Sequence, residues 1–177
     1  MVIKVVTDST ADLPTDIAED LGIEVVPLNV HFGVDVYKDK IDLAPDRFYD
    51  LLLNGDVFPT TSQPSVGEFL GVYERLAPNV DGIVSVHVSE KVSGTMNSAR
   101  LAAQQLGDEL PIEVIDTYQA SMGVGLIAIE AAKMAKSSGD LAEVTRVIRN
   151  TIARCECFAM LDTLEYLQKG GRIGKAS

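Results

Sequence analysis

The chain has 177 residues, 46% of them apolar, which is enough for one domain with a sizeable core or for one domain and part of another. Its formal net charge of −11 disfavours a nucleic-acid partner and an anionic membrane surface, because both require a basic face. The apolar start over 1–6 is too short for a secretory signal, and no apolar run approaches the roughly 18 residues of a membrane span. We therefore expect a cytoplasmic protein that neither binds nucleic acid nor inserts stably into a membrane.

Apolar, β-branched runs alternate with amphipathic stretches that begin at capping residues. Pro14 suits the first turn of a helix with Asp12 as its cap, and the capping boxes Ser65–Glu68 and Asp140–Glu143 each open a further helix. The alternation of strands and helices indicates an α/β fold, a mostly parallel sheet with helices on both faces. In chain order, the patterns predict a strand over 3–7, a helix over 12–21, a strand over 25–32, a polar turn over 33–40, helices over 42–53 and 65–76, a strand over 82–88, a helix over 97–106, a strand over 112–115, helices over 121–136 and 140–154, a strand over 155–161 and a short helix over 163–169.

Hydroxyl-rich turns fall at or near the ends of the predicted strands. Ligands bind at the carboxyl ends of strands in a parallel sheet, and hydroxyls beside helix N-termini form an anion site. Gly94 would let backbone approach such a ligand closely. Each hydroxyl could instead serve only as a helix cap, but four such turns at one edge favour a shared polar pocket. The turns are Asp8-Ser9-Thr10, the run from Thr60 to Ser65, Ser93-Gly94-Thr95, and Asp116-Thr117 followed by Ser121.

Two runs imitate nucleotide-binding motifs without meeting their requirements. The run from Gly170 to Ser177 looks like a phosphate-binding loop, but Lys169 stands where the first Gly belongs and Ala176 where a Mg²⁺-binding hydroxyl belongs. The run from Gly123 to Ala128 matches the dinucleotide fingerprint in letters, yet it lies inside a predicted helix, where small residues serve close packing. We therefore expect no cofactor other than a bound ligand.

Nucleophilic catalysis has weak support in the sequence. There is no Gly-x-Ser-x-Gly elbow, and His31 and His87 are the only histidines that could act as a base. His87 lies in an apolar strand, which favours a buried structural role. A triad of Ser93, His87 and Asp116 stays open, although nothing in the spacing favours it. We predict no catalytic residue.

The two cysteines, Cys155 and Cys157, lie in the last predicted strand. Residues two apart on a strand share one face and seldom close a disulfide, so we interpret both as reduced core thiols. A metal site would need more ligands than these two and a distant histidine, and we predict none.

Five segments, in this order along the whole chain, resemble the signature segments of the DegV family: Asp8 to Leu13, Thr61 to Ser65, Ser93 to Thr95, Asp116-Thr117, and Leu167 to Gly174. The resemblance implies two α/β domains that hold a long-chain fatty acid and present it to a separate fatty-acid kinase, which forms the acyl phosphate. It also implies that the protein is a lipid carrier without a reaction of its own.

By that resemblance, Thr61 and Ser93 hydrogen-bond the fatty-acid carboxylate, and Arg172 lies at the mouth of the pocket. Ser62 and Gly94 complete the predicted site. A carboxylate favours short hydrogen bonds and a cation, whereas each buried CH₂ of the acyl chain adds roughly 0.8 kcal/mol. The headgroup contacts are therefore expected to set the orientation of the ligand more than its affinity.

The resemblance divides the chain into a DegV-like N-terminal domain over 1–154 and the start of a second domain over 155–177. Family members usually continue well beyond this point, with a further histidine at the headgroup, so we expect either a fragment or a naturally short protein. Two other functions stay open. One is a hydrolase or transferase with Ser93 or Thr61 as nucleophile, which needs a base within about 2.6–3.2 Å. The other is an interaction module without a ligand.

Overall fold

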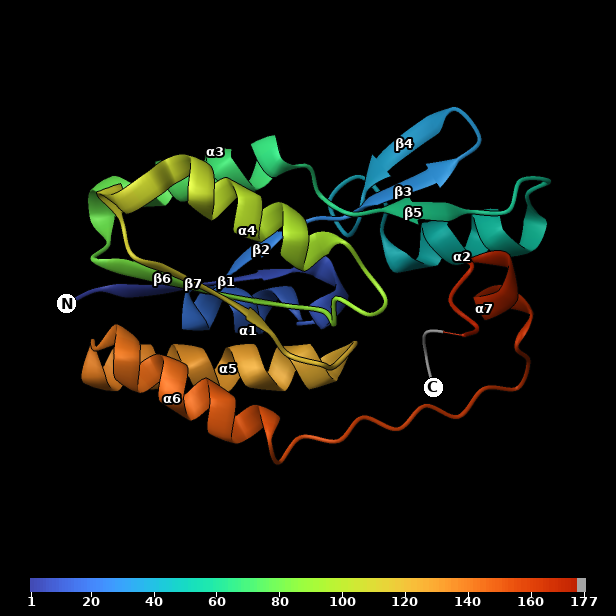
Figure 1. Ribbon diagram of the computed structural model, residues 1–177. Coiled ribbons are helices and arrows are strands. Elements are labelled where there is room, and N and C mark those ends of the chain that lie inside the picture. The colour runs from blue at the N-terminus through green and yellow to red at the C-terminus, as the bar shows by residue number, and fades with distance from the viewer. Residues whose placement is uncertain (175–177) are drawn as a thin grey trace.

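The computed structural model describes residues 1–174, and its centre is a four-stranded parallel sheet. The strand order is β2-β1-β6-β7, and all neighbouring pairs are parallel. Parallel strands require crossover connections, which explains why helices separate most of them in the sequence. The predicted α/β class is therefore confirmed (Figure 1). The strands are β1 (Ile3–Asp8), β2 (Glu24–Val26), β6 (Gly82–His87) and β7 (Ile112–Asp116).

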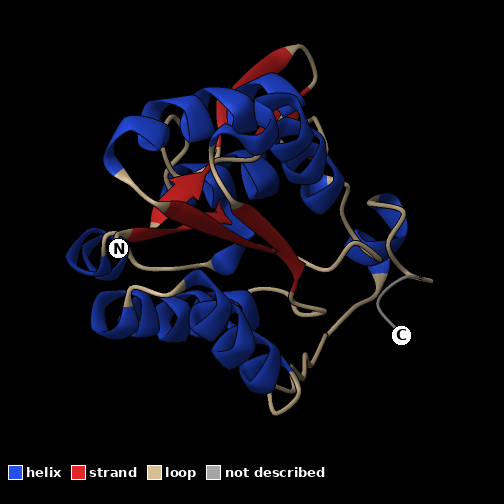
Figure 2. Ribbon diagram, turned by 60° about the vertical axis from the view of Figure 1, so that its left-hand side comes forward, coloured by secondary structure: helices blue, strands red, loops and turns tan. Residues whose placement is uncertain are grey.

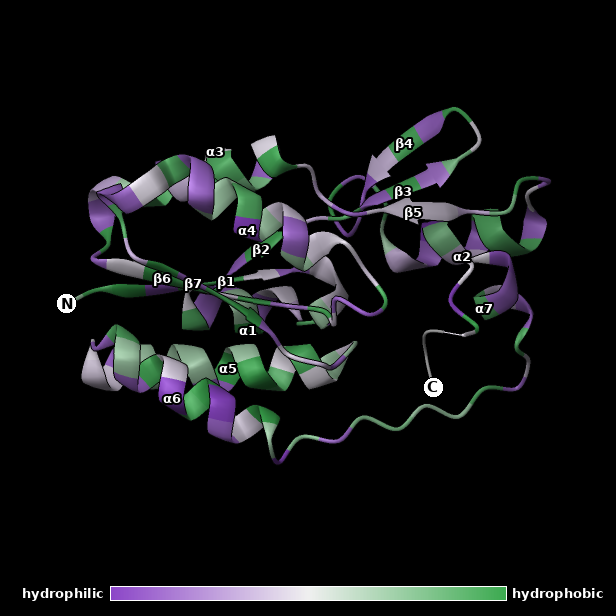
Figure 3. Cartoon of the chain, in the orientation of Figure 1, coloured by the Kyte–Doolittle hydropathy of each residue, from purple (hydrophilic) through white to green (hydrophobic). Residues whose placement is uncertain are grey.

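Helices cover both faces of this sheet, as Figure 2 shows. Strand residues alternate between the two layers: Val5 and Val84 belong to the core under α5 and α6, whereas Val6 and Ile83 belong to the core under α3 and α4. The hydropathy colouring in Figure 3 follows this arrangement, with apolar residues along the strands and most of α5. The helices are α1 (Thr15–Leu21), α3 (Val66–Leu76), α4 (Thr95–Leu106), α5 (Met122–Ser138), α6 (Leu141–Ile152) and the short α7 (Glu165–Lys169).

A second, smaller sheet lies beyond the carboxyl ends of the parallel strands (Figure 1). It is antiparallel with the order β4-β3-β5, and α2 packs against it through a small core of Val30, Phe32 and Leu43. Gly33 begins the tight turn between β3 and β4 with φ of +64°, a conformation that glycine adopts without strain. The elements of this unit are β3 (Asn29–Phe32), β4 (Asp35–Lys38), α2 (Pro45–Asn54) and β5 (Thr60–Ser62).

The single strand predicted over 25–32 is wrong, because it is two strands in two sheets. Pro27 has no N–H to continue a ladder, and the Leu28 N–H donates to Ser9 Oγ at 3.1 Å instead. The polar turn predicted over 33–40 contains β4, which pairs with β3 from Asn29 to Phe32. The sequence pattern did not indicate this strand, because its residues are polar or exposed.

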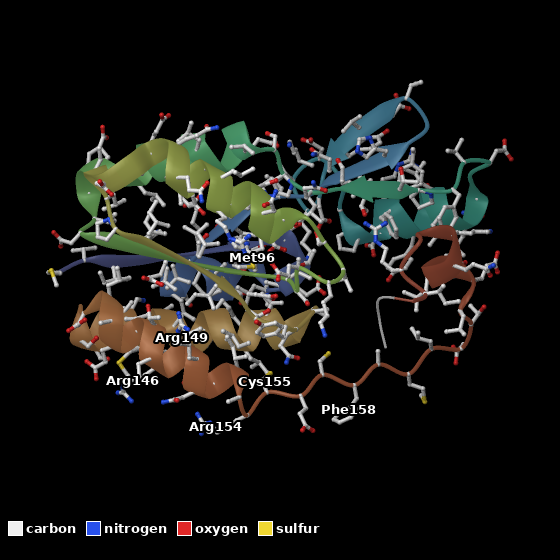
Figure 4. The ribbon with its side chains drawn as sticks, viewed as in Figure 1. Met96, Arg146, Arg149, Arg154, Cys155 and Phe158 are labelled. Atoms are coloured by element: carbon white, nitrogen blue, oxygen red, sulfur yellow. The ribbon has the colours of Figure 1, made fainter. Side chains whose placement is uncertain are left out.

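The predicted strand over 155–161 is also wrong. This segment runs without regular structure between α6 and α7, because no strand of the described chain lies beside it to form a ladder. Figure 4 shows Phe158 projecting away from the ribbon, and the side chain is 88% exposed. Cys155 is half-buried and Cys157 exposed, so the cysteines are free thiols but not core residues.

The start of α1 also differs from the prediction. The helix begins at Thr15 after Pro14, and Asp12 instead ends a short 3-10 turn with its N–H donating to Ser9 O. The remaining predicted helices are present within a few residues of their expected bounds, and the Ser65–Glu68 capping box is formed. None of the helices over residues 1–174 is long and apolar enough to cross a membrane.

Candidate functional site

The hydroxyl-rich turns after β1, β6 and β7 lie at one edge of the parallel sheet, as predicted from the strand-end rule. The turn after β5 reaches the same edge. A Cβ added to Gly94 would lie 2.8 Å from Gln63 Nε2, so the two segments touch, and a larger residue here would displace the Gln63 side chain. The structure thus brings the segment that carries Thr61 and Ser62 next to the loop that carries Ser93.

Thr61 and Ser62 point to opposite faces of β5. In the antiparallel register Thr61 lies opposite Val30, on the face that packs against α2, whereas Ser62 lies opposite Asn29. The Thr61 side chain is exposed, and no group within residues 1–174 hydrogen-bonds its hydroxyl. Ser62 Oγ is already used, because it lies 2.9 Å from His31 Nε2 and 3.4 Å from Asn29 Nδ2. Of these two hydroxyls, Thr61 is the one that is available to a ligand.

Ser93 lies directly before the N-terminus of α4. Its Oγ accepts the N–H of Thr95 at 3.3 Å and lies 2.8 Å from Thr95 Oγ1. Gly94 is the cap residue and has no side chain to satisfy the first N–H groups of the helix. Those N–H groups and the helix dipole favour a negative charge at this end of α4. A half-buried hydroxyl beside such a helix end suits a carboxylate.

Arg172 follows α7 and is not joined to the other predicted site residues. Its guanidinium donates to the carbonyl of Gly170, and within the described chain it makes no hydrogen bond to Thr61 or Ser93. Helix α7 lies beside α2 (Figure 1), where Tyr166 stacks on Phe58 with ring centroids 5.9 Å apart. Lys169 Nζ lies 5.0 Å from the Phe58 centroid. This docking holds Arg172 on the β5 side of the molecule.

A buried chain of polar groups beneath this edge was only partly anticipated. Asp8 Oδ2 lies 2.9 Å from His87 Nδ1, His87 Nε2 lies 2.7 Å from Ser85 Oγ, and Ser85 Oγ lies 2.8 Å from the Tyr73 hydroxyl. All four side chains have 0% exposure. The sequence indicated a satisfied structural role for His87 but did not identify its partners. The sequence did contain one signal for this network. Ser85 and His87 lie two residues apart in an apolar strand and therefore share one face.

This burial changes the acidity of the network. Burial alone would raise the pKa of Asp8, but the hydrogen bond and electrostatic attraction of His87, with hydrogen bonds from Thr10 and Val88, hold that pKa below its ordinary value. Burial raises the pKa of Tyr73 well above its ordinary value, although the hydrogen bond to Ser85 opposes this. The carboxyl of Asp8 is therefore charged and the Tyr73 hydroxyl protonated at neutral pH.

The open possibility of a Ser93, His87 and Asp116 triad does not match the structure. His87 uses both ring nitrogens on Asp8 and Ser85 and has no access to Ser93. Asp116 instead accepts the N–H of Tyr118 at 2.8 Å in the turn after β7. The serine, histidine and aspartate that do line up, Ser85, His87 and Asp8, are sealed in the core and cannot meet a substrate.

Neither Thr61 nor Ser93 has a base within hydrogen-bond reach in the described chain. The imidazole of His31 lies beside Ser62 instead, and no carboxylate of the described residues orients its other nitrogen. The residues described contain no group of three or more His, Cys, Asp or Glu side chains arranged to hold a metal ion. The run from Gly170 to Ser177, which looks like a phosphate-binding loop, has its last residues, 175–177, outside the described residues.

Two open hollows of the surface lie away from this edge. A hollow of about 620 Å³ is lined by Arg100, Leu110 and Val114, between α4 and β7. Another, of about 480 Å³, is lined by Met1 and Arg149 at the opposite end of the strands. Neither contains the hydroxyls of the strand-end turns, so we assign the candidate site from its chemistry rather than from the depth of a pocket.

Comparison with known proteins places this arrangement in a family. A family model described as "Uncharacterised protein, DegV family" matches residues 2–177. A DegV domain-containing protein of Clostridium perfringens is 38% identical over 180 residues, which cover 100% of this chain and 63% of the relative. The chain therefore spans less than two thirds of the length of this curated relative.

Solved structures agree with the sequence comparison. A structure described as fatty acid binding of a DegV family protein from Thermus thermophilus is 38% identical, with a TM-score of 0.88 over 98% of this chain and 61% of that one. DegV from Bacillus subtilis, described as a fatty acid binding protein, is 32% identical, with a TM-score of 0.91 over 99% of this chain and 62% of that one. With the fold, the strand-end turns and the family model in agreement, this chain belongs to the DegV family.

Proposed function

We propose that this chain binds a long-chain fatty acid by its carboxylate and, in the cytoplasm, presents it to a fatty-acid kinase for acyl-phosphate formation. The observation that carries the proposal is the contact between Gly94 and Gln63, which sets the Thr61 segment beside Ser93 at the N-terminus of α4. The two related structures described as fatty acid binding support the same ligand.

In this proposal Thr61 and Ser93 donate hydrogen bonds to the carboxylate, and the end of α4 favours its charge. Gly94 keeps the space beside the headgroup open, and Arg172 supplies a cation at the mouth of the site. Ser62 takes a supporting role, because His31 already engages its hydroxyl. The acyl chain contributes most of the affinity, at roughly 0.8 kcal/mol per buried CH₂.

We also propose that the protein is a carrier and catalyses no reaction alone. The hydrolase alternative requires a base beside Ser93 or Thr61, whereas the two imidazoles of the described residues lie beside Ser62 and the buried Ser85. Ester hydrolysis that disappears in Ser93→Ala would overturn this part of the proposal.

Extraction of the purified protein and mass spectrometry of the released lipids test the proposed ligand. We expect fatty acid in extracts of the wild-type chain and a clear reduction in a Thr61→Val, Ser93→Ala double variant purified in the same way. Wild-type extracts without fatty acid, from cells rich in lipid, would contradict the proposal. Addition of a fatty-acid kinase and ATP to the loaded protein, followed by detection of acyl phosphate, tests the proposed partner.

A further inference from the structure

The peptide unit between His87 and Val88 is clamped from both sides by the neighbouring strands. Its N–H, on Val88, donates to Asp8 Oδ2 at 3.3 Å. Its C=O, on His87, accepts Thr117 Oγ1 at 2.7 Å and the Thr117 N–H at 3.2 Å. This peptide unit is the last of β6 before the loop that leads to Ser93. The ends of β1, β6 and β7 are thus tied together at a single point.

Asp8 is the charged member of the clamp, and its carboxylate binds three residues at once. Its carboxylate accepts the Thr10 N–H at 3.0 Å and the Thr10 hydroxyl, the Nδ1 of His87, and the N–H of Val88. A buried carboxylate that accepts several N–H and O–H donors forms bonds about twice as strong as neutral ones. The turn after β1 and the loop after β6 therefore share one rigid acceptor.

The direction of the buried chain supports this role. Because Asp8 is a charged acceptor, the Nδ1 of His87 carries a proton, which leaves Nε2 to accept from Ser85. The Ser85 hydroxyl in turn accepts from Tyr73 of α3. Every polar atom of the chain is satisfied in this arrangement, so the imidazole ring is fixed and Asp8 is fixed with it.

The loop from Val88 to Ser93 is held by hydrogen bonds to the turn after β7 and by hydrogen bonds within the loop. The Ser89 N–H donates to Gln119 O at 3.0 Å, and the Glu90 N–H reaches Asp116 Oδ2 at 3.4 Å. The Ser93 N–H donates to Ser89 O at 3.1 Å, so the position of Ser93 is built on Ser89 and hence on Val88. The position of Ser93 therefore depends on Ser89, which directly follows the clamped peptide.

We propose that Asp8 is a positioning residue for the carboxylate site and acts through the His87–Val88 peptide to set the place of Ser93. This inference rests on the proposed function and goes beyond it, because Asp8 is wholly buried and does not touch the ligand. It assigns a binding role to a residue whose local geometry alone indicates only a turn cap.

The test is a double-mutant cycle on ligand affinity, with palmitate and palmityl alcohol as probes. Asp8→Asn keeps the shape of the side chain but replaces one acceptor oxygen by an N–H₂ group. We expect about a tenfold loss of palmitate affinity, the loss associated with one misplaced hydrogen bond to a charged group, and a smaller loss for the alcohol. In a Ser93→Ala background the same change should cost almost nothing further, because the two residues act in series.

Thr117→Val is the milder second variant, because it removes one donor to the His87 carbonyl and keeps the side-chain volume. It should lower palmitate affinity in the same direction even if Asp8→Asn fails to fold. Asp140→Asn is the matched control. Its carboxylate caps α6 through the N–H groups of Ala142 and Glu143 at the far end of the domain, so affinity should be unchanged.

The outcomes separate the two proposals. A wild-type protein that binds neither probe overturns the proposed function itself. Wild-type binding of palmitate with additive effects of Asp8→Asn and Ser93→Ala overturns the positioning role of Asp8. Equal losses for acid and alcohol overturn it as well, because general loosening of the fold would affect both probes alike. A palmitate-selective, non-additive loss supports it.

Discussion

At the scale of single residues, the hydroxyls of Thr61 and Ser93 differ in the hydrogen bonds that they make within the protein. Thr61 is exposed and has no partner among residues 1–174, whereas Ser93 holds the N–H of Thr95. We expect Thr61→Val to change the unfolding free energy by less than about 0.5 kcal/mol and Ser93→Ala to lower it by about 0.5–1 kcal/mol. Each should weaken fatty-acid binding about tenfold.

The matched control for Thr61 is Thr60→Val, because Thr60 is an exposed neighbour on the same strand whose side chain faces the other way. Its affinity for fatty acid should equal that of the wild type. Titration calorimetry and urea unfolding on the three variants decide the matter. A stability loss in Ser93→Ala with unchanged lipid affinity would reduce Ser93 to a helix cap.

The buried Asp8 carboxyl predicts how stability responds to acid. Its folded pKa lies below its ordinary value near 3.8, so the native state resists protonation of this group more than the unfolded chain does. The stabilisation is present above the unfolded pKa and is lost as the pH falls through the lower, folded pKa. Urea unfolding measured from neutral to acidic pH should therefore show a shallower acid limb in Asp8→Asn. An acid limb as steep as that of the wild type would contradict the assignment.

At the scale of elements, α3 offers two substitutions of opposite sign. Ser65 and Glu68 cap the helix reciprocally, so Ser65→Ala should lower the unfolding free energy by about 1 kcal/mol. Gly71 lies in the middle of α3, and a Cβ there would meet no atom within 4 Å. Gly71→Ala should therefore raise stability by about 0.5–1 kcal/mol. Urea unfolding of both variants checks the signs, and destabilisation by Gly71→Ala would show an unseen constraint on α3.

The elements that were predicted correctly are those whose signals are local. The Ser65 capping box and the buried strand of β6 depend on a few adjacent residues, and both are present. The strand expected over 155–161 failed because an apolar, extended segment becomes a strand only beside a partner, which is a property of the surroundings. The break at Pro27 was visible in the sequence, but its meaning, a change from one sheet to another, depended on tertiary structure.

The same distinction applies to the candidate site. Ser93 and Gly94 could be placed at the carboxyl edge of the parallel sheet because they follow a parallel strand. The location of Arg172 could not, since it depends on the docking of α7 through Tyr166 and Phe58. The pairing of Asp8 with His87 joins residues 79 positions apart through the β1–β6 register, and no local pattern encodes that separation.

At the scale of the whole molecule, the domain boundary predicted near residue 154 remains a prediction. The parallel sheet and its two helical layers are complete by the end of α6 at Ile152. Beyond it, the chain crosses to the other side of the strand-end edge, where α7 contacts the loop between α2 and β5 (Figure 1). That this stretch begins a second domain also stays a prediction.

The small antiparallel sheet and α2 form an insertion in the chain between β2 and α3. The chain leaves the parallel sheet after Val26 and packs on it again at α3. All of its ladder partners lie within this one continuous stretch, and it has its own small core of Val30, Phe32 and Leu43. Such a unit can open and close as a separate foldon while the β1–β6 pairing remains intact. The amide hydrogens of the Thr61 strand would then exchange by local opening, and one side of the proposed carboxylate site would open independently of the other. Under the proposed function, this offers a route for a lipid to enter without global unfolding.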